Sequence, residues 1–162
     1  IGALLVAEKL FEPFKHGTTL FPHGYTYGGH PVSAAVALEN LDIFDEEDLV
    51  GNVARNQAAF KASLDSLRDL PIVGDVRGIG YFWAIELVKD KTTKETFNDA
   101  ESEKLLRGIL SQKMFEEGLY CRSDDRGDPV VQLAPPLTIG PDQFDEMTQI
   151  LRGALEHAWK AL

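Results

Sequence analysis

The stretch with the clearest chemical potential is the loop Phe21–Pro31, which reads Phe-Pro-His-Gly-Tyr-Thr-Tyr-Gly-Gly-His-Pro. Gly28 and Gly29 can adopt backbone angles that turn N–H groups outward, and Thr26 can donate its hydroxyl. A helix that begins at Pro31 would add the positive end of its dipole. These donors predict a site for an anion. A structural turn that leads into a capped helix is the alternative, which the residue types alone do not exclude.

Other residues that often carry chemistry have weaker patterns here. The four histidines invite a zinc interpretation: His16, His23, His30 and His157. No metal site is expected, because glycines and a proline separate the first three and no cysteine or carboxylate lies at a ligand spacing. The segment 77–80, Arg-Gly-Ile-Gly, lacks the third glycine of a dinucleotide fingerprint and lies between two predicted strands, which excludes a Rossmann site. The single cysteine, Cys121, is expected as a small strand residue and not as an activated thiol.

Hydrophobic spacing predicts the elements on both sides of the loop. Before it, a continuous apolar run predicts a buried strand over 1–6, followed by a short helix over 8–14. After it, Pro31 stands where a first helical residue belongs, and the helix predicted as far as Phe44 is apolar on most sides. Such a helix is expected to be buried in a longer protein, so this chain alone should expose apolar surface there. A second helix is predicted over 47–70.

From Ile72 onward the sequence predicts an α+β unit with an antiparallel sheet. Gly78 and Gly80 mark the turn of a hairpin, and Asn98 with Glu101 forms a capping-box pattern at the start of a helix. The hairpin strands are expected over 73–76 and 81–88, and the capped helix over 98–118. Two short strands are expected over 119–122 and 130–134, and an amphipathic helix over 141–162.

Composition excludes several classes of protein. The 162 residues are 44% hydrophobic and 26% charged, which is enough to bury a core. A formal net charge of -10 would repel a phosphate backbone or an anionic membrane, so neither nucleic acid nor membrane is an expected partner. One cysteine cannot form an intramolecular disulfide, and a cytoplasmic location is expected.

The loop and three later segments resemble the class III pyridoxal-phosphate (PLP) aminotransferases of fold type I. In that family the pattern His-Gly-aromatic-Thr-Tyr-(Ser/Gly)-Gly-His-Pro marks the loop, and residues 23–31 contain it complete. The likeness continues in Val76-Arg77-Gly78-Ile79-Gly80 with Glu86-Leu87, in Gly118-Leu119, and in Ala134-Pro135-Pro136-Leu137. Because the four motifs follow the family's order, the resemblance covers essentially the whole chain.

The resemblance implies a fold and a place within a larger enzyme. The parent would be an α/β enzyme of PLP transferase fold type I that works as a homodimer. Residues 1–58 would be the end of its large domain, with the loop and a linking helix, and residues 59–162 its carboxyl-terminal small domain. The chain also opens without Met inside an apolar run, which favours a cut through a longer protein, although a processed terminus gives the same pattern.

The resemblance also implies roles for individual residues. Thr26 would contact the cofactor phosphate across the dimer interface, with Tyr25 as its backbone neighbour. The Schiff-base lysine, the family's catalytic residue, would lie upstream of Ile1, so the chain alone is expected to be inactive. Arg122 follows the Gly-Leu motif, where the ω-amino acid:pyruvate branch has an arginine that binds the substrate carboxylate.

Alternatives remain open at this stage. Acetylornithine and ornithine transaminases usually have an arginine just before the Pro-Pro-Leu segment, where this chain has Gln132, so the ω-amino acid:pyruvate branch is favoured. Its expected substrates are an amine or amino-acid donor and a keto-acid acceptor. Acetylornithine, ornithine and 4-aminobutyrate transaminases stay open as alternatives within the family. Arg122 also lies beside Asp124, Asp125 and Asp128, and a surface ion pair is the alternative explanation for it. A hypothesis of a different class is a non-catalytic α+β module that folds alone.

Overall fold

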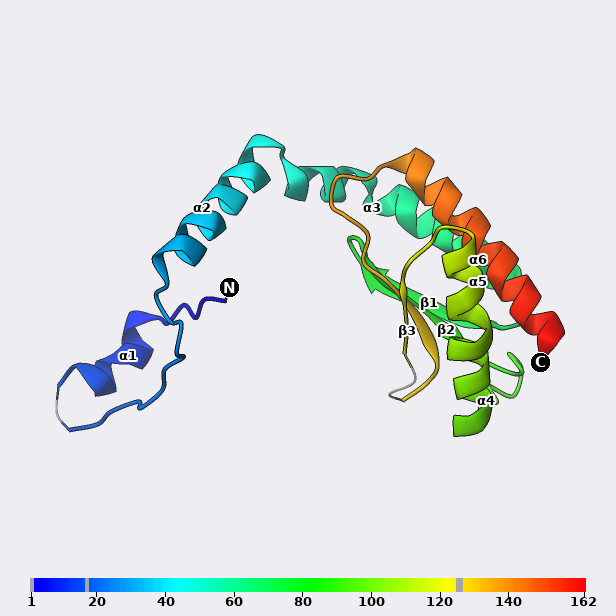
Figure 1. Cartoon of the computed structure of the whole chain (residues 1–162), viewed down its shortest axis with the longest axis horizontal. Coiled ribbons are helices and arrows are strands. Elements are labelled where there is room, and N and C mark those ends of the chain that lie inside the picture. Colours follow the sequence, from blue (N-terminus) through cyan, green and yellow to red (C-terminus); the bar gives the residue numbers. More distant parts are fainter. Residues whose placement is uncertain (1, 17, 125–126) are drawn as a thin grey trace. The chain divides into compact units, whose positions relative to one another are not determined.

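A computed structural model describes residues 2–16, 18–124 and 127–162 of the chain (Figure 1). Contacts divide the chain into two units, Ile1–Asp48 and Leu49–Leu162. The first unit ends at Asp48, ten residues before residue 58, where the sequence predicts the boundary between the two domains of the parent. Contacts within this chain do not define the domains of a longer enzyme, so the assignment of residues 1–58 and 59–162 stays a prediction.

The first unit contains two helices in its described residues, α1 (Glu8–Lys15) and α2 (Pro31–Glu46). Both were predicted. The strand predicted over 1–6 is wrong for residues 2–6, which form no regular structure and have exposed side chains; Ile1 lies outside the described residues. A buried strand needs neighbouring strands for its backbone groups, and the described part of this unit contains no other strand with which it could pair.

Helix α2 keeps its apolar side chains in contact with solvent. Val32, Val36 and Leu38 are 64%, 65% and 63% exposed, and no residue of the helix is buried. This agrees with the expectation that the chain alone exposes apolar surface at this helix. Exposed apolar area on this scale is a feature of surfaces that another part of a protein covers.

The second unit begins with α3 (Leu49–Asp65), which continues into the short 3₁₀-helix η1 (Ser66–Asp69). The sequence predicted one helix over 47–70, so the position is confirmed but the last turn is tighter than expected. Phe60, Leu64 and Leu67 from this segment are fully buried. They form the face that packs on the sheet and on the last helix.

The described residues form one four-stranded antiparallel sheet in the order β1-β2-β4-β3. Its strands are β1 (Val73–Ile79), β2 (Phe82–Leu87), β3 (Arg122–Asp124) and β4 (Val130–Leu133). The predicted hairpin is confirmed as the β1–β2 pair. Gly80 has a φ of +56°, and a Cβ on Gly78 would collide with the Phe82 carbonyl oxygen and the Trp83 Cα. The two glycines are therefore required by the turn and by the close approach of the two strands.

Two helical segments cover one face of this sheet. The first consists of α4 (Asp99–Glu103), the π-helix η2 (Lys104–Leu110) and α5 (Ser111–Glu116), and the second is α6 (Pro141–Ala161). The predicted capping box is present: Asn98 Oδ1 accepts from the Glu101 N–H at 3.0 Å, and Glu101 Oε2 accepts from the Asn98 N–H at 2.9 Å. The π-helical middle was not predicted, because the spacing of Leu105, Leu106, Ile109 and Leu110 in the sequence also fits an ordinary α-helix.

The two faces of the sheet differ in what covers them. Val131, Leu133 and Ile85 are fully or almost fully buried on the helix side. The neighbouring residues point to the other side, where Ile79 is 78% and Phe82 66% exposed. We call this side, which carries Arg77, Phe82, Ala84, Gln132 and Arg122, the open face of the sheet.

Candidate functional site

The loop Phe21–Pro31 forms a tight turn in the first unit. The Gly28 N–H donates to the Tyr25 carbonyl oxygen at 2.9 Å, and the His30 N–H donates to the Tyr27 carbonyl oxygen at 3.2 Å. Gly29 has a φ of +72°, which an L side chain rarely adopts. The pair of glycines therefore shapes the turn, as the sequence indicated.

Thr26 and Tyr25 both lie at this turn, and both are exposed. Within residues 2–16, 18–124 and 127–162, no hydrogen bond involves the Thr26 hydroxyl. The Tyr25 ring packs edge-on against the His23 ring, with centroids 5.0 Å apart, and His23 in turn contacts Phe21 at 5.6 Å. These ring contacts order one side of the loop and leave the Thr26 hydroxyl available to a ligand.

His30 connects the turn to helix α2. Its Nδ1 accepts a hydrogen bond from the Ser33 backbone N–H at 3.3 Å, and Pro31 occupies the first helical position. The side chain thus satisfies one of the unpaired N–H groups at the start of the helix. Sequence reasoning missed this cap, although Pro31 at the first helical position already placed the cap at the preceding residue.

The donor set of the loop fits a phosphate. Residues 21–31 contain no carboxylate, and they present the Thr26 hydroxyl and the Gly29 N–H, for which the described residues provide no acceptor. The N–H groups of Gly28 and His30 are already bound within the turn. Hydroxyl and N–H donors are the groups that bind phosphate oxygens in loops. The residues present therefore fit the phosphate group of PLP, which the resemblance implies.

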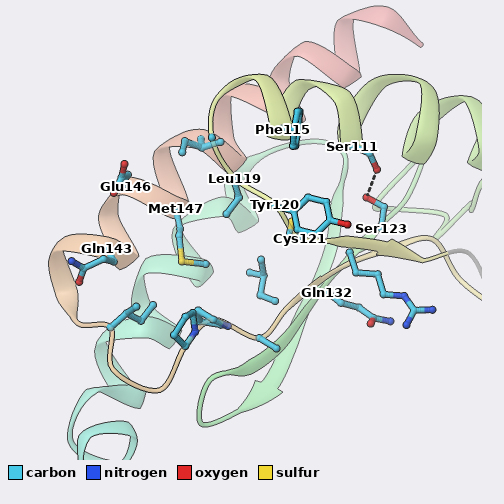
Figure 2. Close-up of a pocket in the computed structure, with 18 of the residues that line it drawn as sticks. Ser111, Phe115, Leu119, Tyr120, Cys121, Ser123, Gln132, Gln143, Glu146 and Met147 are labelled. Carbon is cyan, nitrogen blue, oxygen red and sulfur yellow. Dashed lines mark hydrogen bonds between the residues drawn. The ribbon is translucent and has the colours of Figure 1, made fainter. Parts of the chain in front are cut away.

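A cavity of about 1110 Å³ opens in the second unit (Figure 2). Its walls come from α5, the first half of α6, the start of β3, the end of β4, and the segment 134–136 that contains the Pro-Pro pair. Phe115, Leu119 and Met147 supply apolar walls, and Gln132 supplies a polar one. Asn52, at the start of α3, holds the segment after the prolines, because its Nδ2 donates to the Leu137 carbonyl oxygen at 2.7 Å.

Arg122 lies on the border of this cavity as the first residue of the edge strand β3. The sequence predicted a strand over 119–122, whereas the observed strand is Arg122–Asp124, so Arg122 lies at its start and not at its end. The Ser111 hydroxyl donates to the Ser123 hydroxyl at 3.2 Å and ties β3 to α5 (Figure 2). Arg122 is exposed. This position is compatible with binding a negatively charged ligand at the edge of the cavity.

Cys121 lines the same cavity but is not poised for nucleophilic chemistry. Burial raises the pKa of its thiol to about 11, so the thiol stays protonated at neutral pH. The Sγ atom lies 3.5 Å from the Met114 Sδ. Cys121 precedes β3 instead of lying in a strand, but the expectation of a small, unreactive packing residue agrees with its surroundings.

The predicted site residues fall in different units of the chain. Tyr25 and Thr26 lie in one turn of the first unit, and Arg122 lies in the second unit. In the part of the chain that the structure describes, no group of three or more His, Cys, Asp or Glu is arranged to hold a metal ion. No helix among those residues is long and apolar enough to cross a bilayer.

Comparison with known proteins places these features in a family. A sequence model described as Aminotransferase class-III matches residues 1–155. A probable aminotransferase of Mycobacterium tuberculosis is 60% identical over 155 residues, which cover 96% of this chain and 33% of that protein. The putrescine–pyruvate aminotransferase of Pseudomonas aeruginosa is 37% identical over 163 residues, which cover 100% of this chain and 34% of that protein.

The structure matches the same kind of protein. A PMP-bound aminotransferase from Vibrio fluvialis superimposes with a TM-score of 0.78 at 35% identity, over 94% of this chain and 32% of that chain. This chain thus spans about a third of the length of the relatives that it matches. Family match, sequence identity and fold agree, and the chain belongs to the class III aminotransferases.

Proposed function

We propose that this chain is the carboxyl-terminal part of a PLP-dependent transaminase that moves an amino group from an amine or ω-amino acid to a keto acid such as pyruvate. The observation that carries the proposal is the loop 21–31, where a glycine turn presents the Thr26 hydroxyl with no acidic residue nearby in sequence. The relative from Pseudomonas aeruginosa, a putrescine–pyruvate aminotransferase, supports this pair of substrate classes.

Thr26 would hold the cofactor by its phosphate. PLP, when bound, supplies an electron sink that makes the proton on the substrate carbon acidic. Thr26 would donate the same hydrogen bond at every stage of turnover, because a phosphate is not changed by the reaction, and would fix the position of the cofactor without taking part in proton transfer. Tyr25 would contribute its backbone, while its ring stays with His23.

Arg122 would bind the substrate carboxylate. A guanidinium presents a fork of N–H donors that matches a carboxylate. Arg122 borders a cavity whose other walls include Phe115, Leu119 and Met147, so a substrate could place its carboxylate at the rim and its carbon chain inside.

The parent would be a homodimer with the two-domain division at residue 58. The exposed apolar side chains of α2 support the presence of further protein around this chain, because Val32, Val36 and Leu38 would otherwise face water. Because the implied Schiff-base lysine lies upstream of Ile1, the isolated 162-residue chain is expected to show no transamination. A cytoplasmic location stays a prediction.

Replacing Thr26 with alanine tests the proposal. In the full-length enzyme, Thr26→Ala is expected to weaken PLP retention by about 1.5 to 3 kcal/mol, because a hydrogen bond to a charged group is lost. The KM values for donor and acceptor should change little when PLP is saturating. The measurement is the amount of PLP that stays bound after dialysis, followed by its absorbance.

Thr19→Ala is the matched control, because Thr19 is an exposed threonine of the same unit that lies outside the loop. It should retain PLP as the wild type does. If Thr26→Ala retained as much PLP as the wild type, the assignment of Thr26 to the cofactor site would be overturned. The loop would then be interpreted as a structural turn that leads into a capped helix.

A further inference from the structure

The segment 134–139 forms one wall of the cavity. It reads Ala-Pro-Pro-Leu-Thr-Ile and follows β4, whose pairing with β2 ends at Leu133. Its two prolines have no N–H group with which to extend a ladder of hydrogen bonds. The residues of the segment that line the cavity are Ala134, Pro135, Pro136 and Ile139. The sheet therefore does not hold this wall in place.

Side chains from α3 and from the hairpin turn hold the segment by its carbonyl groups. Asn52 Nδ2 donates to the Leu137 carbonyl oxygen at 2.7 Å and to the Ile139 carbonyl oxygen at 3.1 Å. The Tyr81 hydroxyl also donates to the Ile139 carbonyl oxygen, at 3.0 Å. Hydrogen bonds from two different elements thus converge on the backbone just after the proline pair.

The two donor side chains are themselves fixed. Asn52 Oδ1 accepts a hydrogen bond from Asn56 Nδ2 at 2.9 Å, one turn further along α3, so the amide has a single orientation in which both of its N–H groups face the segment. Tyr81 is buried, with its ring edge-on to those of Phe60 and Phe144 at centroid distances of 5.5 and 5.4 Å. Rigid donors therefore determine where the wall lies.

The cavity that this wall borders suits a hydrocarbon chain. Phe115, Leu119 and Met147 form apolar walls around it (Figure 2), and the proline rings add a rigid apolar surface. Each methylene group that is fully buried against such surfaces strengthens binding by roughly fourfold. This gain depends on close contact, so it is lost when one wall moves.

We propose that Asn52 and Tyr81 are positioning residues that set the wall 134–139 against the carbon chain of the amine donor, an inference that rests on the proposed function. Neither side chain itself lines the cavity, so both act through the segment that they hold. The two residues thereby determine how strongly the enzyme prefers a long amine to a short one.

Asn52→Asp tests the proposal, because it keeps the shape of the side chain and replaces its N–H₂ donor with an oxygen that repels both carbonyl groups. The measurement is kcat/KM of the full-length enzyme loaded with PLP for n-hexylamine and for n-propylamine, with pyruvate as acceptor. The wild type should prefer n-hexylamine at least about tenfold, because the longer chain buries more methylene groups. In Asn52→Asp this preference should fall to about threefold or less, with the value for n-propylamine within about threefold of the wild type.

A merely structural role of Asn52 would lower kcat/KM for both amines equally and leave the preference unchanged. Gln57→Glu is the matched control, because it makes the same change from amide to carboxylate at an exposed position of α3 away from the cavity. It should keep the wild-type preference. Tyr81→Phe retains the ring in the core but loses one hydrogen bond to the segment, so the preference should fall by about twofold.

Hydrogen exchange measures the position of the wall without reference to activity. The Ile139 N–H donates to the Pro136 carbonyl oxygen at 3.3 Å, and its exchange should accelerate about tenfold in Asn52→Asp, while exchange in β1 and β2 stays at the wild-type rate. Unchanged exchange at Ile139 would show that Asn52 does not hold the segment and would overturn the proposal.

The kinetic results separate the two proposals. If exchange at Ile139 accelerates in Asn52→Asp but the preference for n-hexylamine persists, the positioning role is overturned and the proposed function stands. If the wild type shows no such preference, the assignment of the wall to the carbon chain is overturned. A wild type that transfers no amino group from any amine or ω-amino acid would instead overturn the proposed function. If Asn52→Asp does not fold, Tyr81→Phe provides the test, and an unchanged preference in that variant would overturn the positioning role.

Discussion

Replacing Arg122 with alanine in the full-length enzyme is expected to raise the apparent KM for pyruvate and for ω-amino acids on the order of a hundredfold. The reason is that two charge-assisted hydrogen bonds to the carboxylate would be lost together. The KM for an amine donor without a carboxylate should change much less, because that substrate has no partner for the guanidinium. Steady-state kinetics with the two donor classes measures the difference.

Arg55→Ala is the control for a general loss of positive charge. Arg55 is an exposed arginine on α3 that does not border the cavity, so its replacement should leave all KM values near those of the wild type. Wild-type kinetics toward pyruvate in Arg122→Ala would instead support the interpretation of Arg122 as a surface ion-pair residue, which contributes little.

Phe60→Ala is expected to lower the free energy of unfolding of the second unit by about 3 to 5 kcal/mol. Phe60 is fully buried, with its ring centroid 4.7 Å from that of Phe144 and 5.5 Å from that of Tyr81. These three rings join α3, the hairpin turn and α6. Removal of one ring would leave a cavity where all three meet, and chemical denaturation of the chain measures the loss.

Phe115→Ala is the matched control for this prediction. Phe115 is also a helical phenylalanine of the second unit, but it is 68% exposed, so its replacement should change the free energy of unfolding by about 0.5 kcal/mol or less. Equal effects of the two replacements would contradict the assignment of Phe60 to the centre of the core.

Local patterns in the sequence were sufficient for much of the secondary structure. Pro31 marked the start of α2, Asn98 and Glu101 marked the capped start of α4, and Gly80 marked the hairpin turn. Each of these signals acts between residues at most four positions apart, so it can be recognised without knowledge of the fold. The strand predicted from the apolar run at residues 2–6 was wrong, because a buried strand depends on neighbouring strands that no local pattern specifies.

By itself, the sequence determined the family resemblance, the glycine turn that presents Thr26 and the order of helices and strands in the second unit. The tertiary structure alone decided which side chains meet across the sheet. Gln132 is ten residues from Arg122 in the chain, and only the β3–β4 register makes the two neighbours. A shift of that register by one residue would bring buried Val131 or Leu133 opposite Arg122 instead. Register is set by burial of one whole face of the sheet, which is a property of the packed fold and not of any short segment.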